Sequence, residues 1–163
     1  MARLVVFLGM VLCLSVATAS DVAAQRRGFI IGFGAGPGFT TGDVDSRVGI
    51  ATDFKIGGML GESLQLYYSA KSNLLFYDGD PEATGVSGIG AAYVLPSGFN
   101  INGLAGLATW VDFDGGTSNG FGLGAGVGYE FTDKWVFNVG GTFGVFEGDK
   151  VFNIAATISI LSH

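Results

Sequence analysis

Large apolar residues alternate with small or polar ones along most of the chain, most clearly over residues 119–146. In residues 119–131 aromatic and aliphatic side chains alternate with glycines, and in residues 135–146 they alternate with Gly, Asn and Thr. A period of two residues indicates β-strands. The short polar stretch 132–134 between the two halves predicts an antiparallel hairpin.

Eight segments with this alternation follow one another along the chain. We predict strands over residues 28–39, 47–58, 63–76, 86–95, 99–111, 119–131, 135–146 and 150–161. One face of each segment is mostly large and apolar, and the other is rich in glycine and polar residues. A barrel in lipid places its apolar face outward and its small or polar face inward. The sequence therefore predicts an all-β protein, an eight-stranded antiparallel up-and-down transmembrane β-barrel.

Composition and the N-terminal segment indicate a membrane protein that is exported through a secretory signal peptide. The chain of 163 residues is 48% apolar and only 13% charged, which is unusual for a soluble protein. Its long apolar run, residues 4–16, follows Arg3 and precedes small residues, as in a secretory signal peptide, and is shorter than the roughly 20 residues of a membrane-spanning helix. We expect cleavage after Ala24, or else after Ala19, so that residues 1–24 are a signal peptide and 25–163 form the barrel.

The connections between predicted strands differ in length. Those at 59–62, 96–98 and 132–134 are tight, whereas 40–46, 77–85 and 112–118 are longer and 147–149 is a short exception. Short periplasmic turns and longer extracellular loops are typical of outer-membrane barrels, so we expect both termini in the periplasm. Aromatic residues are predicted to form a girdle at each membrane interface. The girdle near the turns comprises Phe29, Tyr93, Phe99, Tyr129, Phe131 and Trp135, and that near the loops comprises Phe39, Phe76, Phe113, Phe121, Phe143 and Phe152.

Four charged residues, Asp53, Lys55, Lys71 and Glu130, fall on the inward face. Because buried charges are costly unless paired, we expect a lumenal network. Asp53 and Lys71 are predicted to pair between neighbouring strands, and Lys55 and Glu130 to pair across the barrel or to approach through water. A polar plug that closes the barrel is favoured over an ion pathway, because eight strands leave room for little more than side chains.

Glycines on the first and sixth predicted strands leave volume beside the lumen wall. Either large inward residues such as Tyr67, Leu104 and Trp110 fill this space, or a small ligand occupies it. The sequence leaves these alternatives open.

Acidic residues gather in the predicted extracellular connections. Candidate ligands for Ca²⁺ or Mg²⁺ there are Asp43, Asp45, Asp78, Asp80, Asp112, Asp114, Glu147 and Asp149, with Glu82 nearby. Carboxylate oxygens suit these ions, and a divalent ion could bridge the rim to lipopolysaccharide phosphates. The alternative is an acidic, solvated set of loops that binds no specific metal.

Charge and residue types exclude several functions. A formal net charge of −6 argues against binding nucleic acid through its phosphates. The single cysteine, Cys13, lies in the predicted signal peptide, and the single histidine is His163. No nucleophile–base pair or paired-acid constellation is evident, so we do not expect an enzyme or a resident cofactor.

The eight-segment outline, the GFGAGPGF opening at residues 32–39 and the GVGYEFTDKW hairpin at residues 126–135 resemble the small outer-membrane β-barrel superfamily, that is, the barrel domains of outer membrane proteins A, X and W. The resemblance implies a location in the Gram-negative outer membrane, contact with its lipids and lipopolysaccharide, and insertion by the barrel-assembly machinery. The chain departs from the C-terminal phenylalanine usual in such barrels, because it ends on Ser162 and His163.

Three functional hypotheses follow from these patterns. The leading one is a non-enzymatic outer-membrane barrel with a structural or surface role, a polar-plugged lumen and an acidic extracellular rim. The second is a narrow channel or carrier for a small solute. The third is a secreted lipocalin-like binder whose apolar face points inward.

Overall fold

The computed structural model describes residues 28–61, 63–77, 80–113, 115–132, 134–146 and 148–162. The predicted signal peptide lies outside the described residues. Within the described ranges, no helix is long and apolar enough to cross a membrane.

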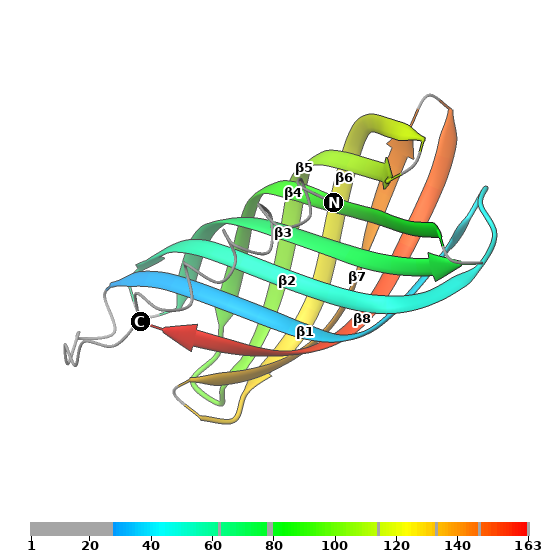
Figure 1. Cartoon of the computed structure of the whole chain (residues 1–163). Helices are drawn as coiled ribbons and strands as arrows, with labels where there is room; N and C mark the ends of the chain where they lie inside the picture. Colours follow the sequence, from blue (N-terminus) through cyan, green and yellow to red (C-terminus); the bar gives the residue numbers. More distant parts are fainter. Residues whose placement is uncertain are drawn as a thin grey trace.

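Eight strands follow one another in chain order and close into a barrel (Figure 1). They are β1 (Phe29–Gly42), β2 (Arg47–Leu60), β3 (Leu64–Tyr77), β4 (Asp80–Val94), β5 (Phe99–Asp112), β6 (Gly116–Glu130), β7 (Trp135–Phe146) and β8 (Asp149–Ser162). Each strand pairs antiparallel with the next, and β8 returns to pair with β1. The predicted all-β, eight-stranded up-and-down topology is confirmed.

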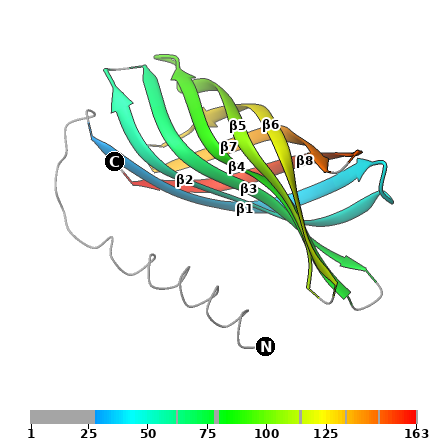
Figure 2. The same cartoon turned by 90° about the horizontal axis from the view of Figure 1, so that it is seen from above.

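The strands are staggered as they go around the barrel. Consider the row of paired residues that starts at Gly34 on β1 and continues through Asp53 on β2, Lys71 on β3 and one residue on each later strand. After one full circuit the row reaches the chain that follows β1 at residue 44. The row is therefore displaced by ten residues along the strand direction. Stagger of this kind accompanies a strand tilt of roughly 35–45°. The oblique strands and the closed outline are visible in Figures 1 and 2.

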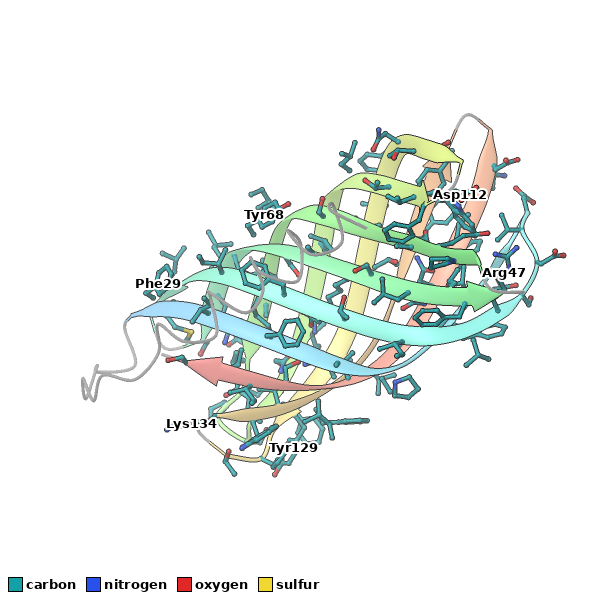
Figure 3. The ribbon with its side chains drawn as sticks, viewed as in Figure 1. Phe29, Arg47, Tyr68, Asp112, Tyr129 and Lys134 are labelled. Carbon is teal, nitrogen blue, oxygen red and sulfur yellow. The ribbon has the colours of Figure 1, made fainter. Side chains whose placement is uncertain are left out.

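The two faces of the barrel wall have opposite character. Outward residues such as Phe29 and Ile89 are 61% and 69% exposed, whereas the inward Ser69 and Asn73 are 0% and 1% exposed. Side chains of Phe29, Tyr68 and Tyr129 lie on the outside of the barrel in Figure 3. The predicted apolar-outward, polar-inward arrangement is therefore confirmed. The lipocalin-like hypothesis, which required the apolar face inward, is wrong.

Connection lengths differ from the prediction. Those after β1, β3, β5 and β7 span residues 43–46, 78–79, 113–115 and 147–148, and those after β2, β4 and β6 span 61–63, 95–98 and 131–134. The prediction of longer connections at one end of the barrel is therefore wrong. The segment 77–85 mostly continues the ladder, with Phe76 paired to Pro81 and Leu75 to Glu82. Backbone pairing does not require apolar side chains, so the strands extend through residues that the hydrophobic pattern assigned to loops.

The outward aromatics form two belts around the barrel. One belt lies near the connections 61–63, 95–98 and 131–134, here named the turn end, and the other near the remaining connections, the loop end. Rings within each belt touch: the Phe99 and Tyr129 centroids are 4.8 Å apart, and those of Phe143 and Phe152 are 4.7 Å apart. This arrangement matches the aromatic girdles of transmembrane barrels.

Candidate functional site: the barrel lumen

A chain of polar contacts crosses the lumen at mid-height. Lys71 Nζ on β3 lies 3.9 Å from Asp53 Oδ2 on β2, as the sequence predicted for this pair. Ser69 Oγ donates a hydrogen bond to Asp53 Oδ1 at 3.3 Å. Lys71 Nζ donates to Asn102 Oδ1 on β5 at 3.4 Å, and Asn102 Nδ2 donates to Asn100 Oδ1 at 3.1 Å. We name these five residues the charge network.

Lys71 pairs with Val86 on β4, and the next inward positions of that strand toward the turn end are glycines. Ser69 pairs with Gly88 and Tyr67 with Gly90, so two inward positions of β4 carry no side chain beside β3. The ring of Tyr67 occupies the space beside Gly90, and its hydroxyl donates to the Ala91 carbonyl at 3.2 Å. Glycine here creates room that longer side chains from β3 then fill.

Lys55 and Glu130 form no ion pair with each other, so the direct pairing predicted for them is wrong. Lys55 is only 8% exposed, and its Nζ lies 5.5 Å from the centroid of the Tyr67 ring, in the range of a cation–π contact. Glu130 is the last residue of β6 at the turn end, whereas Lys55 lies five residues before the end of β2, so the two residues do not share a height in the barrel. An approach through water stays a prediction.

A second polar cluster joins four strands nearer the loop end. Thr40 Oγ1 on β1 donates to Asn153 Oδ1 on β8 at 2.7 Å, and Asn153 Nδ2 donates to Thr142 Oγ1 on β7 at 3.1 Å. Asn73 Nδ2 on β3 contacts Thr40 Oγ1 at 3.1 Å and Asn153 Oδ1 at 3.4 Å. We name these four residues the asparagine cluster. The sequence analysis missed it, although inward Asn73 and Asn153 were the signal that could have indicated it.

A small cavity lies between the charge network and the asparagine cluster. Its volume is ≈ 30 Å³, and Asp53, Lys71, Asn73, Asn138 and Thr157 contribute to its polar lining. A space of this size, with polar groups in its lining, holds a water molecule or two and is too small for a larger solute. The lumen is therefore nearly filled at mid-height.

Apolar side chains fill the lumen on both sides of these polar groups. The turn-end plug consists of Ile30, Val136 and Leu161, with Met59 packed against it. The loop-end plug consists of Val86, Leu104, Ala108, Phe146 and Val151, with Val44 and Trp110 packed against it. The lumen is thus filled by polar and apolar side chains together, rather than by the polar plug alone that the sequence predicted.

Large side chains occupy the space beside the glycine wall. A Cβ atom added at Gly124 would lie 3.3 Å from Leu104 Cβ, and one added at Gly122 would lie 2.6 Å from Val86 Cγ2. Of the three residues expected to fill this space, Leu104 lies beside Gly124, whereas Tyr67 lies beside Gly57 and Gly90 on β2 and β4, and Trp110 packs against the cluster that contains Val86 and Ala108.

One ion pair spans the loop end of the lumen. Arg47 Nη1 on β2 lies 2.7 Å from Glu82 Oε2 on β4, with β3 between the two strands. Side-chain exposures of 16% and 17% show that the pair is largely enclosed. Arg47 and Asp112 lie at this end of the barrel in Figure 3. The sequence analysis placed neither Arg47 nor Glu82 in the lumen.

The acidic rim is only partly described. Asp78, Asp114 and Glu147, and the side chain of Asp80, lie outside the described residues. Asp43 Oδ2 accepts a hydrogen bond from the Lys150 backbone N–H at 2.9 Å. Among the described side chains, which include Asp43, Asp45, Asp112 and Asp149, no group of three or more His, Cys, Asp or Glu residues could hold a metal ion. Calcium or magnesium binding at the rim and its alternative, solvated acidic loops without a specific metal, both stay predictions.

Solved structures with the same architecture include several outer-membrane proteins. Ail, the attachment invasion locus protein of Yersinia pestis, matches with a TM-score of 0.62 and 11% identity over 85% of this chain and 100% of Ail. The fold is that of the small outer-membrane β-barrels. OprG of Pseudomonas aeruginosa matches with a TM-score of 0.60 and 12% identity over 88% and 100% of the two chains. Neisserial surface protein A matches with a TM-score of 0.57 and 17% identity over 84% and 99%.

These structural similarities, with TM-scores of 0.57 to 0.62, establish the barrel fold alone, because the sequence identities are low. No protein-family model matches the sequence, and no curated protein sequence matches it.

Proposed function

We propose that this chain is a non-enzymatic outer-membrane β-barrel with a structural or surface role and a closed lumen. The observation that carries the proposal is the combination of an apolar, aromatic-belted exterior with a lumen that side chains occupy except for one small cavity. The exterior suits hydrocarbon, in which only closed barrels and helices satisfy every backbone polar group. Two apolar clusters in the lumen, one at the turn end and one toward the loop end, support a closed interior.

The proposed topology places the turn end in the periplasm and the loop end at the cell surface. Residues 28 and 162 both belong to the turn end, so this orientation makes both termini periplasmic. Export by a cleaved signal peptide and insertion by the barrel-assembly machinery are further parts of the proposal. The partners are then outer-membrane phospholipids around the barrel and lipopolysaccharide near the acidic rim.

The lumenal polar groups support a structural rather than a catalytic role. Asp53, Lys71, Asn73 and Asn153 are engaged with one another or with neighbouring lumenal residues. Ail has been crystallised with the heparin analogue sucrose octasulfate. We do not extend that ligand class to this chain, because Asp43, Asp45 and Asp149 give its loop end a negative character that would repel a polysulfate.

A narrow channel for a small solute is the second candidate function, and the cavity at mid-height is the observation that favours it. Its volume of ≈ 30 Å³ limits the cargo to water or a bare small ion unless a plug moves. The closed barrel therefore remains the leading proposal, and the channel is the second.

Two measurements on one preparation test the proposal. Outer-membrane extracts of expressing cells should contain the protein as a folded species whose gel migration changes on boiling. The purified protein, inserted in planar bilayers, should show no unitary conductance. A soluble protein without heat-modifiable migration would overturn the membrane location. Reproducible single-channel steps, absent with boiled protein, would instead favour the channel.

A further inference from the structure

Three hydroxyl side chains lie on the outer face of the barrel, between the two aromatic belts. Thr52 on β2, Ser72 on β3 and Ser87 on β4 are half-buried and point outward, because their neighbours along each strand point into the lumen. Ser72 precedes Phe76 of the loop-end belt along β3, and Ser87 precedes Tyr93 of the turn-end belt along β4. On β1, β6, β7 and β8, by contrast, every outward residue between the belts is apolar or glycine.

These hydroxyls use only part of their hydrogen-bonding capacity within the barrel. Thr52 Oγ1 and Ser72 Oγ lie 2.9 Å apart, and that single hydrogen bond uses one of the two hydroxyl hydrogens. Ser87 has no hydrogen-bond partner among the described residues. A hydroxyl without a partner is costly in hydrocarbon, where water does not supply the missing hydrogen bond.

Small residues surround the hydroxyls. Across the ladder between β3 and β4, Ser72 pairs with Gly85 and Ala70 pairs with Ser87. A Cβ atom added at Gly85 would lie 2.7 Å from Ser72 Cβ, so no side chain separates the two strands there. We name Thr52, Ala70, Ser72, Gly85 and Ser87 the hydroxyl patch. Within membranes, small residues let two protein surfaces approach closely, and hydroxyl groups then form hydrogen bonds between them.

We propose that the hydroxyl patch is the contact surface of a homodimer in the membrane. A two-fold axis along the membrane normal keeps the two patches at the same depth and places each against its own kind. Because a hydroxyl both donates and accepts, each patch supplies the partners that the other lacks, whereas saturated acyl chains supply none. The patch carries no charge, so the two copies do not repel each other there. The inference rests on the proposed membrane location and adds a second copy of this chain as a partner.

Energy transfer between labelled copies tests the dimer. The single cysteine of the chain, Cys13, lies in the predicted signal peptide, so Asp45→Cys at the exposed rim provides one labelling position in the mature protein. Donor-labelled and acceptor-labelled protein are reconstituted together into phosphatidylcholine vesicles over a series of protein-to-lipid ratios. Energy transfer should rise with the protein-to-lipid ratio and fall when unlabelled protein is added.

Three variants locate the contact. The triple variant Thr52→Val, Ser72→Ala, Ser87→Ala removes the hydroxyls with little change in size and should weaken association by about 3- to 20-fold, the range of one side-chain hydrogen bond between membrane segments. Ser72→Phe adds bulk to the patch and should abolish association. Ala125→Phe adds the same bulk at an outward position on β6 and should associate like wild type.

Cross-linking gives an independent measurement. Under mild oxidation Ser87→Cys should form a disulfide-linked dimer in the same vesicles, and Ala125→Cys should not. A monomer at every protein-to-lipid ratio would overturn the proposal and would indicate that the hydroxyls are satisfied within one copy or by lipid. Equal association of Ser72→Phe and Ala125→Phe would also overturn it.

Heat-modifiable migration of the same samples reports insertion separately. A folded, inserted barrel that stays monomeric contradicts only the dimer, whereas failure to insert contradicts the proposed function.

Discussion

Asn73 on β3 occupies the space that a side chain at position 38 on β1 would need. A Cβ atom added at Gly38 would lie 2.8 Å from Asn73 Cγ and 3.0 Å from Nδ2. The same Nδ2 donates to the Phe39 carbonyl at 3.2 Å and to Thr40 Oγ1 at 3.1 Å. Glycine at position 38 therefore lets a β3 side chain reach past β2 and hydrogen-bond with β1.

Gly38→Ala should destabilise the folded barrel by about 1–3 kcal/mol, because Asn73 must leave buried hydrogen bonds to make room. Urea-induced unfolding in detergent micelles, followed by tryptophan fluorescence, measures the change in free energy of unfolding. Gly103→Ala is the matched control, since a Cβ atom there meets only the Gly124 carbonyl oxygen, at 3.8 Å. Equal stability of the two variants would contradict the proposed packing of Asn73.

Asp53→Ala should destabilise the barrel more than a typical surface change, because it leaves the Lys71 ammonium in the lumen without its carboxylate. Loss of one partner of a buried pair costs about 3–5 kcal/mol, and the 20% side-chain exposure of Lys71 reduces the expected value to the lower part of that range. The same unfolding experiment measures it.

A double variant, Asp53→Asn with Lys71→Met, should recover part of this loss because the Lys71 ammonium is removed together with its carboxylate, although Lys55 stays in the lumen without Asp53. Asp45→Ala, at the exposed rim, is the control and should change stability by less than about 0.5 kcal/mol. A double variant no more stable than Asp53→Ala would show that lost packing, not the unpaired charge, dominates.

Val127→Lys should destabilise the barrel in a bilayer by about 2–4 kcal/mol, because it places a charge on the outer face between the aromatic belts. Val127 is 55% exposed on β6, so the same change would be nearly harmless if water surrounded the barrel. Thr117→Lys, on the same strand beyond the loop-end belt, is the matched control with little expected effect. Folding yield into lipid vesicles and urea unfolding from them provide the comparison, and equal behaviour of the two variants would argue against a lipid-facing exterior.

Calcium should leave the thermal unfolding midpoint within about a degree of its value in chelator. The measurement is sensitive enough to test this, because a stabilisation of 1 kcal/mol would move the midpoint of a domain of this size by about 2–8 °C. The physical reason is that Asp43 already accepts the Lys150 N–H and no described group of acids converges on a metal position. Choline chloride at equal ionic strength controls for screening. A calcium-specific rise of several degrees would instead establish the rim as a metal site and direct attention to Asp78, Asp114 and Glu147.

The alternation of side chains was sufficient to predict the barrel and which face of its wall points outward. A period of two residues separates the two faces of a strand, and this separation does not depend on which strand lies beside it. It also identified Asp53, Lys55, Lys71 and Glu130 as lumenal, and it paired Asp53 with Lys71 because these residues lie on consecutive strands. Strand ends were less predictable. Pro81 and Glu82 resemble loop residues, yet they pair with β3, since pairing depends on the backbone of the neighbour.

Contacts between strands that are not neighbours came only from the tertiary structure. The stagger of the barrel decides which inward residues share a height, so it separated Lys55 from Glu130 and brought Arg47 to Glu82 and Asn73 to Thr40. It also decided that the space beside the lumenal glycines is filled. The sequence by itself thus determined which side of the wall each residue faces, through the period of the strand. Tertiary structure decided which side chains meet across the lumen, because that depends on a register set by the closure of all eight strands.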